Sequence, residues 1–92
     1  MDTYSEKVYL VTRFYISASD YHSNAHSDCE VFSEKDEATN LFRIWREEEL
    51  ELRKETGCAY EIYKDTEEIF NCSWDSDLEM MVLTLQKKEI KR

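Results

Sequence analysis

Apolar residues alternate with a two-residue period in the first part of the chain. Residues 7–17, KVYLVTRFYIS, are rich in β-branched and aromatic side chains, and both of their alternating registers carry apolar residues. This double alternation is typical of a strand in the middle of a sheet. One register is the more apolar and is predicted to face the core: Val8, Leu10, Thr12, Phe14 and Ile16. The other is amphipathic and can keep its polar tips in water: Tyr9, Val11, Arg13 and Tyr15.

The next segment changes from polar to apolar just before a helical pattern begins. Residues 18–28, ASDYHSNAHSD, collect Ser, Asn and Asp, which favour local side-chain to backbone hydrogen bonds over regular structure. We predict a loop of about ten residues here. Residues 29–32, CEVF, predict a short strand that leads directly into the helix.

A long amphipathic helix is predicted from about residue 34 to 55. Ser33 is the expected N-cap, because a hydroxyl there precedes acidic residues in the first turn. Gly57, the only glycine, stands where a left-handed C-cap residue belongs. Glu49 interrupts the apolar stripe, which predicts that the last two turns project past the sheet or meet another surface. The stripe recurs at helical spacing: Ala38, Leu41, Phe42, Trp45 and Leu52.

The second half of the chain predicts three strands joined by short polar turns. Residues 58–64, 68–74 and 78–88 are apolar runs, separated by polar residues at 65–67 and 75–77. The resulting order β-β-α-β-β-β, with short connections, predicts an α+β fold. We expect two layers, an antiparallel sheet of four to five strands with one long helix packed on one face.

A single helix can cover only one face of such a sheet. The uncovered face is either solvated or an interface with another molecule. With the apolar register turned to the core, the uncovered face carries Tyr9, Arg13 and Tyr15, joined by Tyr63 from a later strand. Tyrosine and arginine are enriched at protein interfaces, so this face is a candidate contact surface for a protein partner or a second copy of the chain.

Length and composition limit the chain to one domain over residues 1–92. With 92 residues it is too short for separate cofactor and substrate domains. Its 41% hydrophobic and 13% aromatic content distinguishes it from disordered acidic chains. The net charge of -9 is unevenly spread, because residues 87–92 hold four basic side chains and one acidic, or +3. Residues 1–86 therefore carry -12, since -9 minus +3 is -12, and residues 87–92 are predicted to form a basic C-terminal tail.

The negative charge argues against direct binding of nucleic acid and against docking on an anionic membrane. An array of carboxylates on a rigid body can instead imitate the phosphates of a duplex and occupy the basic groove of a nucleic-acid enzyme. Small acidic inhibitors encoded by phages and mobile elements work in this way. The alternative explanation of the charge is solubility. The candidate carboxylates are Glu47, Glu48, Glu51, Glu55, Glu67, Glu68, Asp75 and Asp77.

The cysteines and the N-terminal residues favour a cytoplasmic protein. Residues 1–7 are polar, and no run of 18 apolar residues occurs, which argues against secretion and membrane spanning. Cys29, Cys58 and Cys72 are an odd number at wide spacings without a C-x-x-C pair, as expected of reduced thiols. Cys72 lies in an apolar run and is predicted to be buried.

No motif predicts an enzyme or a cofactor. A single glycine excludes the glycine-rich loops that bind phosphate or dinucleotides. His22 and His26, flanked by Asp and Cys, are weak candidates for a metal site and a metal-dependent activity. Their spacing suits a helix, whereas this segment is predicted to be a loop, so two solvated histidines are the preferred interpretation.

One junction resembles proteins of bacterial and phage genomes. Residues 31–38, VFSEKDEA, are similar to the short strand, F-S pair and acidic helix start found in many small uncharacterised proteins of those genomes. The resemblance implies an accessory protein without an assigned activity and supplies no functional residues. Together with the patterns above, it favours a non-enzymatic, cytoplasmic protein-binding domain, with a nucleic-acid mimic as the alternative.

Overall fold

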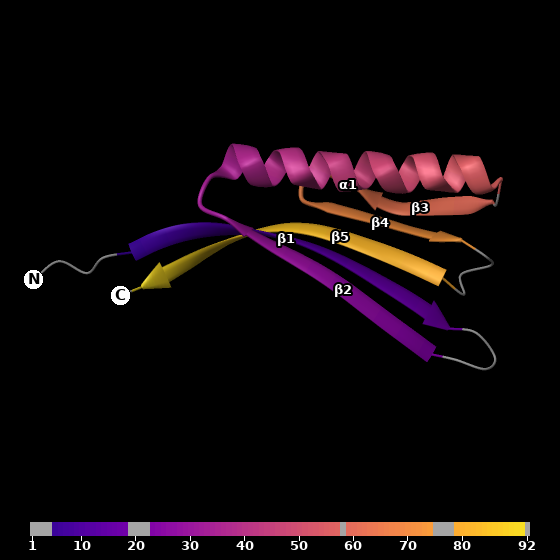
Figure 1. Cartoon of the computed structure of the whole chain (residues 1–92), viewed down its shortest axis with the longest axis horizontal. Helices are drawn as coiled ribbons and strands as arrows, with labels where there is room; N and C mark the ends of the chain where they lie inside the picture. The colour runs from indigo at the N-terminus through magenta and orange to yellow at the C-terminus, as the bar shows by residue number, and fades with distance from the viewer. Residues whose placement is uncertain (1–4, 19–22, 58, 75–78, 92) are drawn as a thin grey trace, which may run out of the picture.

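The computed structural model describes residues 5–18, 23–57, 59–74 and 79–91 of the chain (Figure 1). One long helix packs against a five-stranded antiparallel sheet, which confirms the predicted α+β fold and the order β-β-α-β-β-β. In chain order the elements are β1 (Ser5–Ala18), β2 (Ser23–Phe32), α1 (Lys35–Thr56), β3 (Tyr60–Asp65), β4 (Ile69–Trp74) and β5 (Glu79–Lys91).

The strand order in the sheet is β2-β1-β5-β4-β3, and every neighbouring pair is antiparallel. Three of these pairings join consecutive strands. The fourth pairs β1 with β5, from Ser5 opposite Lys91 to Ser17 opposite Glu79. The beginning and the end of the described chain therefore lie side by side (Figure 1).

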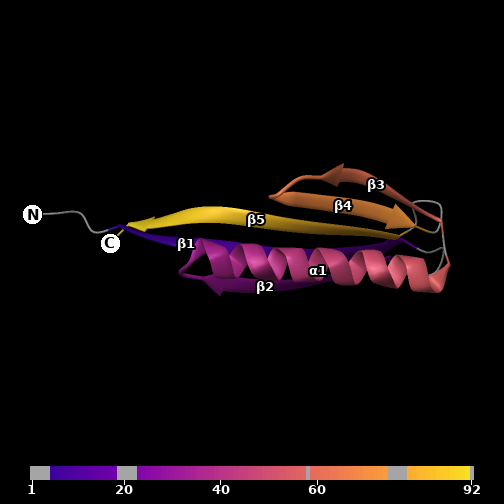
Figure 2. The ribbon, with the colours of Figure 1, turned by 90° about the horizontal axis from the view of Figure 1, so that it is seen from above.

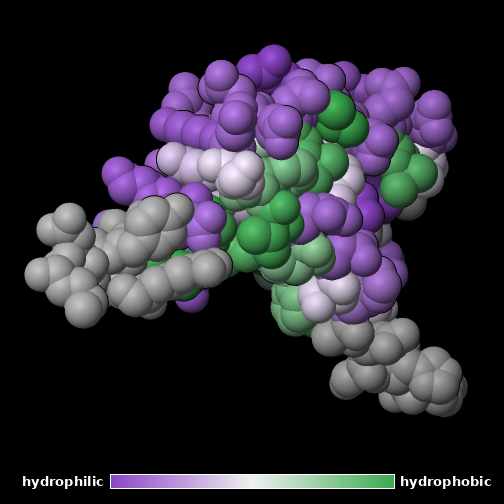
Figure 3. Space-filling model, turned by 60° about the vertical axis from the view of Figure 1, so that its left-hand side comes forward, coloured by the Kyte–Doolittle hydropathy of each residue, from purple (hydrophilic) through white to green (hydrophobic). Residues whose placement is uncertain are grey.

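Helix α1 runs lengthwise over the side of the sheet that holds β1 and β2, and the hairpin of β3 and β4 lies beside it (Figure 2). It packs on β1, β5 and β2. Arg46 ties it to β3, because its Nε and Nη2 donate to the two carboxylate oxygens of Asp65 at 2.8 and 2.6 Å. The outer surface of α1 is hydrophilic, and hydrophobic side chains gather below it (Figure 3).

The two ends of α1 differ in how well the sequence predicted them. Gly57 has a φ of 70°, so the left-handed C-cap is confirmed, and its N–H donates to the carbonyl of Lys54. The predicted N-cap at Ser33 is wrong. Glu34 occupies that position in an extended conformation, without a side-chain capping bond, and its carbonyl accepts the first helical hydrogen bond from Ala38.

Two segments form more strand than predicted. Residues 23–28, predicted as loop, belong to β2, because they pair continuously with β1. Residues 87–91, predicted as the start of a basic tail, continue β5 and pair with the first residues of β1. In both cases the partner strand supplies backbone hydrogen bonds that the local sequence pattern does not reveal.

The core lies between α1 and the sheet, and it shows that the two faces of β1 were predicted the wrong way round. Val11 is fully buried and Tyr9 and Tyr15 pack against the core, so the amphipathic register faces the helix. The more apolar register, which includes Leu10 and Phe14, faces away from it. The buried hydrophobic residues are Val11, Ala38, Phe42, Phe70, Cys72, Trp74, Met81 and Leu83.

Cys72 is buried on β4, as predicted. Burial raises the pKa of its thiol to about 11. A thiol with such a pKa stays protonated near neutral pH and is a poor nucleophile.

Candidate functional site

One face of the sheet is not covered by α1, and we call it the open face. Its members follow from the alternation along each strand and from the register between strands. The open face consists of Glu6, Val8, Leu10, Thr12, Phe14, Ile16, Ser27, Cys29, Val31, Glu61, Lys64, Ile69, Asn71, Ser73, Met80, Val82, Thr84, Gln86, Lys88 and Ile90.

The open face is apolar at its centre. Phe14 and Ile16 on β1 lie opposite Val82 and Met80 on β5, whereas Leu10 lies opposite Gln86. Ordinary antiparallel sheets with one solvated face alternate apolar and polar residues, so the outward residues of their strands are polar. Here the two central strands carry apolar residues on both faces. Such strands are expected to be covered on both sides.

Several of these apolar side chains are accessible. Ile16 is 39% exposed, and Val31 is 60% exposed on the edge strand β2. Apolar side chains gathered on one exposed face mark contact sites on soluble proteins, whereas singly scattered ones are normal. The open face is therefore the candidate protein-binding surface of this chain.

The charges of the open face cancel. Its described residues include two acidic side chains, Glu6 and Glu61, and two basic ones, Lys64 and Lys88. All four lie away from the central cluster around Phe14 and Val82, on β3 or on the far ends of β1 and β5. A neutral face is unusual on a chain whose net charge is -9.

A buried polar cluster lies on the other side of the sheet, between α1 and the strands. The Tyr15 hydroxyl donates to Glu49 Oε2 at 2.8 Å. Arg53 Nε lies 3.1 Å from Glu49 Oε1 as an ion pair one helical turn along, and the Arg53 guanidinium stacks on Trp74 at 3.8 Å. Glu49 is 2% exposed and Arg53 7%. The sequence showed Glu49 as an interruption of the apolar stripe and predicted that the last two turns project past the sheet or meet another surface. These turns instead pack on the sheet, where Glu49 contacts Tyr15 and Arg53 contacts Trp74.

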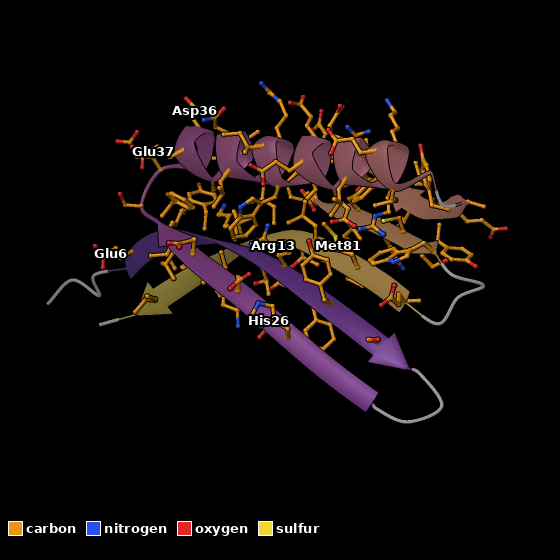
Figure 4. The ribbon with its side chains drawn as sticks, turned by 45° about the vertical axis from the view of Figure 1, so that its right-hand side comes forward. Glu6, Arg13, His26, Asp36, Glu37 and Met81 are labelled. Atoms are coloured by element: carbon orange, nitrogen blue, oxygen red, sulfur yellow. The ribbon has the colours of Figure 1, made fainter. Side chains whose placement is uncertain are left out.

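The cluster continues through Arg13 toward β2. Arg13 lies between the helix and the sheet (Figure 4), with its guanidinium 4.3 Å from the ring centroid of Trp45. Its Nη2 donates to Asp28 Oδ2 at 2.9 Å, and this hydrogen bond holds the pKa of Asp28 below its ordinary value. These contacts orient α1 on the sheet. They also use Arg13 and Tyr15 inside the protein, so neither lies on the open face.

Tyr15 gives this cluster a spectroscopic test. Burial first, and then its hydrogen bond to Glu49, raise the pKa of Tyr15 far above the ordinary value of about 10. The neutral Tyr15 phenol contributes fully to the free energy of unfolding below about pH 10, and this contribution is lost as the pH rises toward the folded-state pKa. At pH 11 to 12 we expect the Tyr15 phenol to ionise only on unfolding, measured as tyrosinate absorbance with and without denaturant. The Tyr15→Phe variant should lose that increment, and an unchanged increment would contradict the assignment.

The remaining predicted contact residues are scattered. Tyr9 packs against the core. Tyr63 is 52% exposed at the irregularity in β3, where the register with β4 shifts. Asp75 and Asp77 lie outside the described residues. Four acidic residues that were predicted to bind a partner are exposed on the second half of α1, namely Glu47, Glu48, Glu51 and Glu55.

Glu67 and Glu68 are exposed at the turn between β3 and β4. They line a groove of about 650 Å³ whose other wall is the first half of α1, from Lys35 to Arg46. The groove holds basic and acidic side chains together. The four predicted carboxylates on the second half of α1 do not line this groove.

The candidate metal ligands are not brought together in the described part of the chain. His22 lies outside it, and His26 is on β2 with its Nε2 3.5 Å from Asp28 Oδ2 (Figure 4). Among the described residues, no group of three or more His, Cys, Asp or Glu side chains could hold a metal ion. Those residues also include no helix with the length and apolar character needed to span a membrane.

Comparison with known proteins adds no relative. The chain matches no protein-family model, no curated protein and no solved structure. The resemblance of residues 31–38 to small bacterial and phage proteins therefore stays a prediction.

Proposed function

We propose that the protein is a non-enzymatic protein-binding module and that the open face is its contact surface. The observation that carries this proposal is the apolar character of both faces of β1, which Met80 and Val82 continue on β5, while α1 covers only one of these faces. Leaving the second apolar face in water forgoes roughly 25 cal/mol for each Å² that a partner could bury. A protein partner on the open face would recover that free energy.

The make-up of the open face supports a protein partner. Charged residues are depleted at the centre of protein interfaces and aromatic and aliphatic anchors are enriched there. Phe14 has this central position, with Val82 opposite it on β5. The proposal includes a cytoplasmic location, supported by the free, exposed thiol of Cys29, which a reducing compartment preserves.

The second candidate function is imitation of nucleic acid by the acidic surface of α1. It is favoured by the exposure of Glu47, Glu48, Glu51 and Glu55, which the fold presents to solvent on one helix. Binding of this kind would be fast and would weaken steeply with salt. Glu67 and Glu68 lie on the turn between β3 and β4 and not on this helix, so we rank nucleic-acid imitation second.

Site-specific photo-crosslinking separates the two candidates. A photo-reactive amino acid is placed at Ile16 on the open face or at Ile44 on α1, two isoleucines of similar exposure, 39% and 41%. Each protein is irradiated in its native cells, and adducts are identified by mass spectrometry. We expect adducts from position 16 and few from position 44.

The adduct protein is then purified and titrated against the wild type and the Phe14→Glu variant. We expect the variant to bind at least about 100-fold more weakly, because a carboxylate would be buried at the centre of the interface. Adducts from position 44 alone, with binding that a Glu51→Lys change abolishes, would overturn the proposal in favour of nucleic-acid imitation.

A further inference from the structure

The open face is suited to a copy of itself. On the premise of the proposed function, we infer that its partner is a second copy of this chain, packed face to face across a two-fold axis. In such an interface the same surface patch serves both subunits, so the patch must be complementary to itself. A face with an apolar centre and equal numbers of acidic and basic side chains at its margins meets this condition.

The size of the open face matches a stable dimer. Strands lie about 4.8 Å apart and rise about 3.4 Å per residue. The ten-pair ladder of β1 with β2 and the six-pair ladder of β4 with β5 then give a face of roughly 650 Å², or about 1,300 Å² for two copies. Stable protein interfaces bury about 1,200 to 2,000 Å² in total. The uncovered sheet alone is therefore large enough.

Face-to-face packing also keeps the acidic surfaces apart. Two sheets with the same right-handed twist pack at about -30° with their inner side chains interdigitated. Each α1 would then lie on an outer layer, and the two helices would be roughly 30 Å apart. This separation is almost four Debye lengths at physiological salt, so repulsion between two chains of charge -9 is largely screened.

The arrangement explains why β1 is apolar in both registers. In the dimer, one register packs under α1 and the other packs between the two sheets. Leu10 and Phe14 would become core residues of a four-layer particle, with the layers helix, sheet, sheet and helix. Ile16 and Val31 are exposed residues of the open face, so charged side chains at these positions would enter the contact without disturbing the core under α1.

Light scattering on the purified full chain tests this inference. From about 1 to about 200 µM, we expect the mass to rise to twice the chain mass of 11.1 kDa. The double variant Ile16→Lys/Val31→Lys should remain at 11.1 kDa, with its dissociation constant raised at least about 30-fold, because two ammonium groups from each copy would enter the contact. Both positions are exposed, so the variant should keep its circular dichroism spectrum.

Ile44→Lys on α1 is the matched control and should still form the dimer. A wild-type mass near 11.1 kDa at every concentration would overturn the inference. So would a dimer that survives the double variant. A monomeric wild type that still forms adducts with a different protein from position 16 would leave the proposed function supported. If the wild type is monomeric and position 16 forms no adducts, both the inferred dimer and the proposed function are wrong.

Discussion

Replacing Glu49 with leucine is expected to cost about 3 to 5 kcal/mol of the free energy of unfolding. The change leaves the Arg53 guanidinium buried beside Trp74 without its counter-ion, and it leaves the Tyr15 hydroxyl without its acceptor. A domain of this size has about 5 to 15 kcal/mol in total. Urea unfolding followed by circular dichroism should show a much lower midpoint, and the melting temperature should fall by at least about 12 °C.

The double variant Glu49→Leu/Arg53→Met tests whether Glu49 stabilises the protein through its ion pair with Arg53 or only through its packing. Because no unpaired charge remains, it should recover most of the stability that Glu49→Leu loses. The coupling between the two sites follows from the four free energies of unfolding. If the two single changes simply add, Glu49 and Arg53 do not act as a pair, and our description of the cluster is wrong.

The same pair explains why the faces of β1 could not be assigned from hydrophobicity. By composition alone, the register of Val8, Leu10 and Phe14 is the better core face. The helix, however, buries a carboxylate at Glu49, and a buried carboxylate needs donors. Tyr15 donates its hydroxyl to Glu49, and Arg13 stacks its guanidinium on Trp45 of the helix, so the amphipathic register faces α1.

Local signals were sufficient for the element order. Gly57 ended the helix, and the turn after β3 is built by Thr66, whose N–H donates to the carbonyl of Ile69 and whose hydroxyl accepts from the Ile69 N–H. Long-range pairing was not visible locally. Residues 23–28 have a loop-like composition, yet they form an edge strand, where polar residues are tolerated and Asp28 meets Arg13.

The existence of the candidate site was predicted from the sequence, but its residues were not. A single helix on a sheet of four or five strands implies an uncovered face, and that expectation needed only the count of elements. The identity of its residues depended on which register α1 selects. The open face therefore carries Phe14 and Val82 in place of the expected Tyr15 and Arg13.

Truncating Leu83 to alanine is expected to cost about 2 to 5 kcal/mol, because Leu83 is fully buried on the middle strand and a cavity would remain beneath α1. Leu52→Ala removes the same atoms from a helix residue that is 44% exposed, and it should change stability by less than about 0.5 kcal/mol. Both are measured by urea unfolding at one protein concentration, since self-association would couple stability to concentration. Leu83 faces α1 and not the open face, so Leu83→Ala should leave the dissociation constant of the dimer nearly unchanged in the folded protein. Equal losses from the two leucines would show that the core does not lie between α1 and β5.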